Sequence, residues 1–128
     1  MTLTDEEGST LRTAVFGAMV LVSTADPGAV DEESYAGIRA MQKLSPALRQ
    51  VLAAAPPKLP EGSAEDVETG VLAALERSVR ILNAKAPAEA GAFPAAVVAL
   101  CREVATADGQ VAHAEHEMIG KIEAAMAG

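Results

Sequence analysis

Residue types that often hold small proteins together are scarce in this chain. Cys101 is the single cysteine, which excludes an internal disulfide framework and is typical of a reducing compartment. Tryptophan is absent, and aromatic residues make up only 2% of the 128 residues. The core must therefore be built from Ala, Val, Leu, Ile and Met, and an Ala-rich composition of this kind favours closely packed helices over sheets.

Basic residues are also few, since 10 Lys and Arg face 18 Asp and Glu and give a formal charge of −8. Nucleic-acid binders need Lys and Arg to displace phosphate counterions, and no basic cluster is present, so we expect no nucleic-acid partner. Binding to an anionic membrane surface is excluded on the same ground. An acidic surface favours solubility, and it can also attract cations or a basic partner.

Long hydrophobic runs are missing as well. The longest strongly apolar run, Ala14–Val22, is about half of what a bilayer-spanning helix needs. Residues 1–7 are acidic, with no basic region followed by an apolar one, so we expect no signal peptide. These features predict a cytoplasmic protein without direct membrane insertion.

The residues that are present indicate helices throughout. Thr4 followed by Glu7 is a capping-box pattern, and Leu11, Val15, Met19 and Val22 then form one face of a helix. No segment shows sustained apolar and polar alternation. We predict an all-α compact bundle of about six helices in a single domain spanning the whole chain. The predicted helices are 4–25, 31–44, one from Ser45-Pro46, one from Ser63 to Leu82, 93–107 and 112–126, with a Pro-rich linker at 56–60.

One turn pattern occurs twice. Val22–Asp26 matches Val104–Asp108, and each Asp is followed by a Gly, a Val and an acidic helix start. This repeat predicts two related helical hairpins, at about residues 10–44 and 93–127, which flank the helix after Ser63 as a central helix.

The stretch 107–115, followed by Met118-Ile119, resembles the A-D-G-x-V-x-x-x-E signature of the TerB-like family. That family includes the tellurite-resistance protein TerB and a domain of DnaJ-type co-chaperones. The resemblance implies a bundle with two similar hairpins, which agrees with the repeat. It also implies a module that binds metal ions and other proteins in resistance to tellurite and other stresses, without catalytic residues.

The acidic residues of the two turns have two interpretations. They could hold a hard divalent cation such as Ca²⁺ through oxygen ligands. They could instead be structural, since Asp and Gly make the turn and Glu115 reaches back to the backbone at Ala112. Ala112 and Ser34 replace acidic residues of the pattern, which weakens a carried-over metal site. The candidate ligands are Asp26, Asp31, Glu33, Asp108 and Glu115.

Other chemistry-bearing residues are more simply explained as structural. His113 and His116 share a helix face and could bind a transition metal, but near the chain end they are more simply exposed surface. Cys101 falls on an apolar face, where a buried, inert thiol is the usual outcome. No nucleotide-binding fingerprint and no paired catalytic acid and base are present, so we expect no enzyme.

The sequence therefore predicts a TerB-like accessory module of a stress, tellurite-resistance or metal-response system. It would act through its acidic surface on a protein partner, with weak divalent-cation binding at the turns. The alternative is a metal-free interaction or scaffold domain of the same fold. The Ala-rich face of the helix after Ser63 would serve a homodimer as well as a core.

Overall fold

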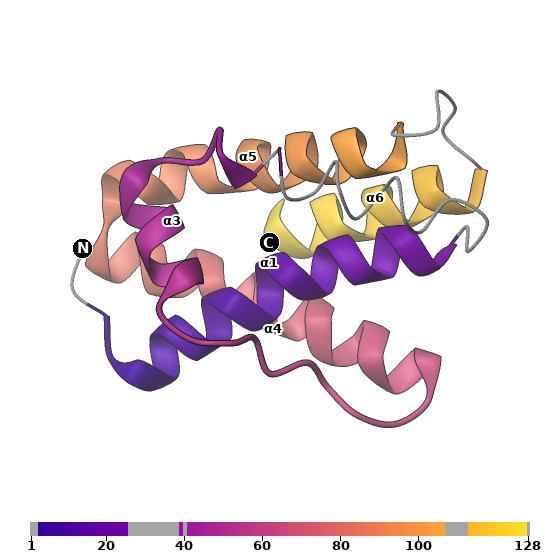
Figure 1. The fold of residues 1–128 in the computed structure, drawn as a ribbon, viewed down its shortest axis with the longest axis horizontal. Coiled ribbons are helices and arrows are strands. Elements are labelled where there is room, and N and C mark those ends of the chain that lie inside the picture. The colour runs from indigo at the N-terminus through magenta and orange to yellow at the C-terminus, as the bar shows by residue number, and fades with distance from the viewer. Residues whose placement is uncertain (1–2, 26–38, 40, 107–112, 128) are drawn as a thin grey trace.

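The computed structural model describes residues 3–25, 39, 41–106 and 113–127, and these residues form helices and no strand. The prediction of an all-α chain is confirmed for this part of the sequence. The helix predicted at 31–44 lies largely outside the described residues. The five helices described are α1 (Asp5–Ala25), α3 (Pro46–Ala53), α4 (Ala64–Lys85), α5 (Pro87–Ala105) and α6 (His113–Ala127), arranged as in Figure 1.

Two helices begin at the predicted capping boxes. At the start of α1 the Glu7 amide donates to Thr4 Oγ1 at 3.1 Å, and the Thr4 amide donates to Glu7 Oε1 at 2.9 Å. At the start of α4 the same reciprocal pair joins Ser63 and Asp66, with both distances 3.1 Å. Each box provides partners for backbone groups that a helix end leaves free, so these boundaries follow from local chemistry alone.

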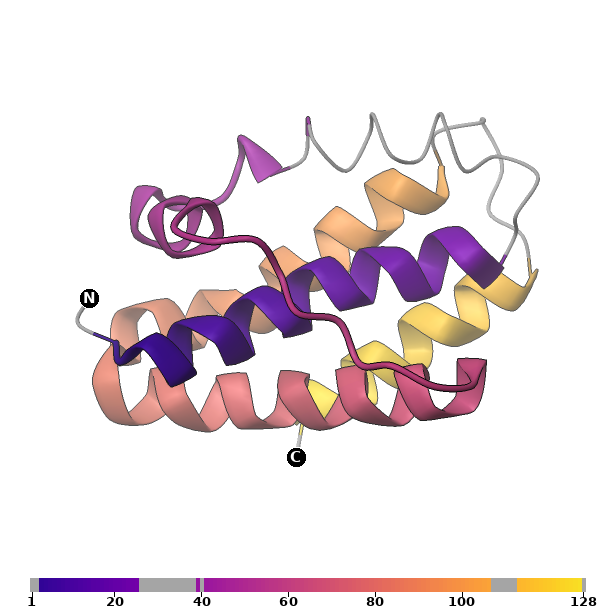
Figure 2. The same ribbon diagram turned by 60° about the horizontal axis from the view of Figure 1, so that its bottom comes forward.

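The short helix α3 also begins as predicted. Ser45 caps it by accepting the Leu48 amide at 3.3 Å, and Pro46 occupies the first turn, where no backbone donor is needed. Leu48 and Leu52 are buried beneath it. After α3 the Pro-rich linker 56–60 is not helical, as expected, and Figure 2 shows it crossing α1 on its way to α4.

The break predicted at residues 83–91 is present but much shorter than expected. The helix α4 continues to Lys85, and Ala86 alone separates it from α5, which begins at Pro87 rather than near Phe93. Gly91 lies in an alanine-rich segment that continues the helix, and the turn is confined to one residue because a proline suits the first turn of a new helix.

Pro94 lies inside α5, where the sequence predicted a helix start. A proline there lacks the amide that would bond to the carbonyl of Ala90. Phe93 next to it is 1% exposed, and Val97, Leu100, Cys101 and Val104 are all buried as predicted. Burial of this apolar face offsets the missing hydrogen bond, so the helix continues through the proline.

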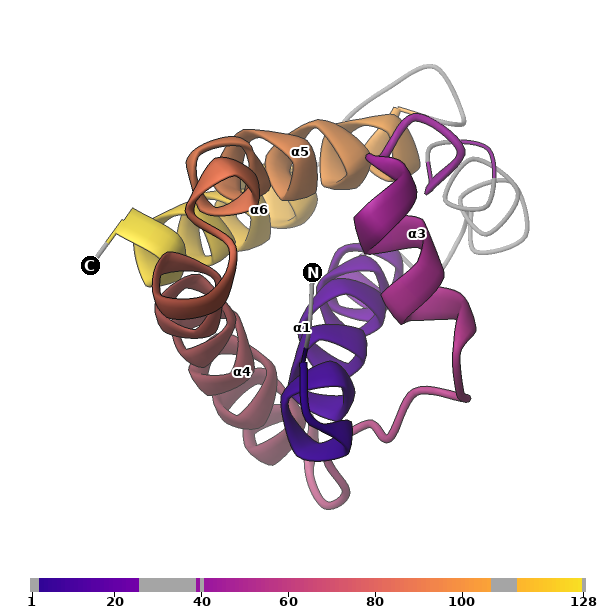
Figure 3. The same cartoon turned by 90° about the vertical axis from the view of Figure 1, so that its left-hand side faces the viewer.

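The helix α1 runs through the middle of the bundle and packs against α3, α4, α5 and α6. Figure 3 shows α3 and α4 on opposite sides of it. Leu11, Val15 and Val22 are buried on α1, and Met19 packs partly buried against the core, which confirms the predicted face. Neither α1 nor any other helix in the described ranges is long and apolar enough to cross a membrane.

Gly17 sets the close approach of α1 and α4. A Cβ atom at this position would lie 2.5 Å from Cγ2 of Val71, well inside van der Waals contact. At this point the backbone of α1 therefore packs directly against the Val71 side chain of α4. These are the two longest helices of the described residues. The apolar stripe predicted for α4 lies on this side, with Val71, Leu75 and Leu82 fully buried.

Candidate functional site

The predicted cation site falls mainly on residues that the structure does not describe. Asp26, Asp31, Glu33 and Asp108 lie outside the described ranges, so Glu115 is the one candidate ligand with a position. The helix ends that flank the two turns can be located. In Figures 1 and 2 the end of α1, the end of α5 and the start of α6 lie at the same end of the bundle.

Glu115 is fully buried in the first turn of α6, with 0% of its surface exposed. A buried carboxylate is costly unless it is hydrogen-bonded or paired with a cation. The surroundings of Glu115 must therefore compensate its charge. Among the described residues, no group of three or more His, Cys, Asp or Glu side chains comes together. Glu115 would therefore need the undescribed turn residues to complete any cation site.

The histidine pair lies on the surface. His113 and His116 are exposed, and Nε2 of His113 lies 3.0 Å from Oε1 of Glu117, one turn further along α6. The side chain of His113 is 85% exposed. The contact is a surface pair of the kind that contributes little to stability.

The thiol of Cys101 is buried on α5, as predicted. Burial in apolar surroundings disfavours the thiolate and raises the pKa of Cys101 to about 12. A nucleophilic cysteine needs the opposite environment, one that lowers the pKa of its thiol. The structure thus gives Cys101 the properties of a small core residue.

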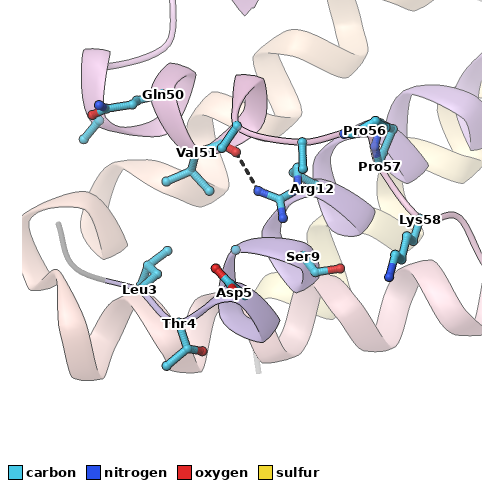
Figure 4. A pocket seen from close by; sticks show the side chains of 14 residues that line it. Leu3, Thr4, Asp5, Ser9, Arg12, Gln50, Val51, Pro56, Pro57 and Lys58 are labelled. Carbon is cyan, nitrogen blue, oxygen red and sulfur yellow. Dashed lines mark hydrogen bonds between the residues drawn. The ribbon is translucent and has the colours of Figure 1, made fainter.

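A feature that the sequence did not predict is a hollow of about 660 Å³ at the opposite end of α1 (Figure 4). It lies between the first turns of α1, the helix α3 and the segment that follows α3. Its lining residues are Leu3, Thr4, Asp5, Gly8, Ser9, Arg12, Ala47, Gln50, Val51, Ala54, Ala55, Pro56, Pro57 and Lys58.

Arg12 is the buried charged side chain of this hollow, with 8% of its surface exposed. Its Nη1 donates a hydrogen bond to the Val51 carbonyl at 2.9 Å, drawn as the dashed line in Figure 4. Gly8 leaves room for the guanidinium, because a Cβ at that position would lie 3.3 Å from Nη1. The hydrogen bond ties α1 to the last turn of α3 across 39 positions of sequence.

The linker is held across the same region by Thr13, whose Oγ1 donates to the Lys58 carbonyl at 2.6 Å. This contact holds the linker alongside α1, and Pro56, Pro57 and Lys58 of the linker line the hollow. The sequence offered one signal for the site, an arginine next to Leu11 at the start of an apolar run. It could not show that the linker folds back over that arginine.

Comparison of the chain with family models, with curated proteins and with solved structures gives no match. The resemblance to the TerB-like family is carried by residues 107–115 and the repeated turn alone.

Proposed function

We propose that this chain is a non-catalytic accessory module of the TerB-like type, which binds a protein partner through its acidic surface. Two related hairpins, at about 10–44 and 93–127, would bring the Asp26 and Asp108 turns to one end of the bundle. A weakly bound divalent cation such as Ca²⁺ would order that end, with ligands from Asp26, Asp31, Glu33, Asp108 and Glu115.

The burial of Glu115 carries this proposal. This carboxylate of the resembled signature has 0% of its surface exposed, at the helix start next to the Asp108 turn. A buried carboxylate is stable where hydrogen bonds or a positive charge surround it, and a bound cation would add to the partners that Glu115 already has. The common location of the helix ends around both turns supports the same site (Figures 1 and 2).

The second candidate is a metal-free interaction domain, and a different observation favours it. Thr4 with Glu7, and Ser63 with Asp66, already form capping boxes in this chain. Glu115 follows Ala112 by the same three positions, so a backbone amide could satisfy it without a cation. In both candidates Cys101, with its raised pKa, and the exposed histidines have no catalytic role.

A thermal melt of the EDTA-stripped chain at fixed ionic strength tests the cation. A cation at one hundred times its dissociation constant adds about 2.7 kcal/mol, or roughly ten degrees in a domain of this size. We expect Ca²⁺ to raise the melting temperature of the wild type. The rise should be lost in Asp26→Ala with Asp108→Ala, and also in Glu115→Gln.

The matched control is Glu123→Gln, since Glu123 is an exposed carboxylate further along α6 and should keep the full shift. Unchanged melts with Ca²⁺, Mg²⁺, Mn²⁺ and Zn²⁺ would contradict the cation site and leave the metal-free domain. Light scattering on the same samples would show whether the protein partner is a second copy of the chain.

A further inference from the structure

Arg12 is a buried cation whose charge the described residues leave unneutralised. Its Nη1 has one acceptor, the Val51 carbonyl, while its Nε is buried without a hydrogen-bond acceptor. None of the ion pairs within the described part of the chain includes Arg12. Because a buried charge is costly without a counter-charge, and no carboxylate of the described residues forms an ion pair with it, this guanidinium favours a bound anion.

The hollow beside Arg12 has room for that anion. Its volume of about 660 Å³ lies within the range of about 300–1,000 Å³ usual for small-molecule sites. Figure 4 shows the second terminal nitrogen of Arg12 pointing away from Val51, toward the side of the hollow formed by α1. Most of the remaining wall is apolar, from Leu3, Ala47, Val51, Ala54, Ala55, Pro56 and Pro57.

The charges around the hollow select the kind of anion. Arg12 and Lys58 are cationic, and Asp5 is the one carboxylate among the described lining residues, so the lining carries one net positive charge. The whole chain carries −8, which makes this hollow an exception on an acidic protein. One negative charge balances the lining, whereas a phosphate dianion would overcompensate it beside Asp5.

We infer that this hollow binds an organic monocarboxylate with a short apolar tail. The carboxylate accepts hydrogen bonds from Arg12, whose planar guanidinium suits it, and Lys58 adds a second positive charge at the rim. The tail lies along the apolar wall formed by Val51, Pro56 and Pro57. A free short-chain acid and the C-terminus of a peptide share this chemistry.

Titration of the full chain with sodium pentanoate, followed by backbone amide shifts in NMR spectra, tests the site. Pentanamide has the same tail without the charge, and phosphate has charge without the tail. We expect saturable shifts at the lining residues with pentanoate and none with the other two. An acetylated Ala-Ala-Val peptide with a free C-terminus, against its C-terminal amide, distinguishes the two sources: tighter binding of the acid peptide than of pentanoate identifies a peptide end.

Four variants test the roles of the charges. Arg12→Gln should weaken pentanoate binding by about tenfold or more, the loss expected for a hydrogen bond to a charged group. Lys58→Gln should weaken it by about two- to threefold, and Asp5→Asn should tighten it by about the same factor, because both residues act at the rim through solvent. Arg49→Gln is the matched control, since Arg49 is an exposed arginine of α3 outside the lining, and it should change nothing.

Lys58→Gln and Asp5→Asn keep the inference testable if Arg12→Gln does not fold, because both residues are exposed. Opposite shifts of the dissociation constant in these two variants support the site. Equal binding of pentanoate and pentanamide, tighter binding of phosphate than of pentanoate, or full binding by folded Arg12→Gln would overturn it.

Discussion

At the scale of single residues, two charged side chains of the described part of the chain are buried, those of Arg12 and Glu115. The remaining charged side chains of the described residues are at least partly exposed, as their hydration requires. A charge is buried only where something compensates it. These two positions are therefore where the chain departs from a simple helical bundle, and both proposed sites are built on them.

Cys101 is the residue for which the structure makes the sharpest chemical prediction. Its thiol is buried and its pKa is raised to about 12, so almost no thiolate exists at neutral pH. We expect no alkylation by iodoacetamide in the native protein at pH 8, and rapid alkylation once guanidinium unfolds it. Mass spectrometry of both samples measures this. Labelling of the native protein at the rate of a free thiol would contradict the buried position.

At the scale of helices, boundaries fixed by local chemistry were predictable, and those fixed by packing were not. The capping boxes at Thr4 and Ser63, and the Ser45 cap, locate three helix starts from a few neighbouring residues. The start of α5 was predicted too late, near Phe93 instead of Pro87, because Gly91 and Pro94 suggest a break. Burial of Phe93 and the residues after it decides in favour of a helix, and burial depends on the rest of the fold.

The contact of α1 with α4 gives a test at this scale. Gly17→Ala would place a methyl group 2.5 Å from Val71, so we expect a loss of stability of about 1–3 kcal/mol from overpacking. Gly120→Ala is the matched control on α6, where an added Cβ meets nothing within 4 Å. That variant should gain up to about 1 kcal/mol through helix propensity.

Urea unfolding of both glycine variants, followed by circular dichroism, measures the difference. The opposite signs separate packing from propensity, because both substitutions are the same change within a helix. Equal stabilisation by Gly17→Ala and Gly120→Ala would show that α1 and α4 are not in close contact at this point.

At the scale of the whole molecule, charge is the dominant surface property. With a formal charge of −8, the folded chain repels itself, while its described ion pairs lie largely on the surface and contribute little. Added salt screens both the repulsion between like charges and the attraction within the ion pairs. Repulsion acts across the whole surface, so we expect it to be the larger of the two.

We therefore expect the melting temperature to rise by a few degrees, corresponding to about 1 kcal/mol, when NaCl increases from low to physiological concentration. KCl at equal ionic strength should have the same effect, because screening does not distinguish the two cations. Differential scanning calorimetry measures both series. A fall of the melting temperature with salt would mean that the surface ion pairs outweigh the repulsion. The Ca²⁺ experiment needs fixed ionic strength for the same reason.

The candidate sites differ in how far the sequence could foresee them. Asp26, Asp108 and Glu115 were selected from a repeated pattern, because turn and capping chemistry is local. The burial of Glu115 was not foreseen. The hollow at Arg12 was missed entirely, because it forms from residues of α1, α3 and the linker that are far apart in sequence.

The sequence by itself determined that the chain is helical, where most of its helices begin, which faces are apolar and that its charge is acidic. Those properties depend on neighbouring residues and on composition, so they can be read along the chain. Only the tertiary structure decided that α5 runs through Pro94, that Glu115 is buried, and that the linker and α3 enclose the guanidinium of Arg12. Each of these depends on which distant segments exclude water from a residue, and that is a property of the folded chain as a whole.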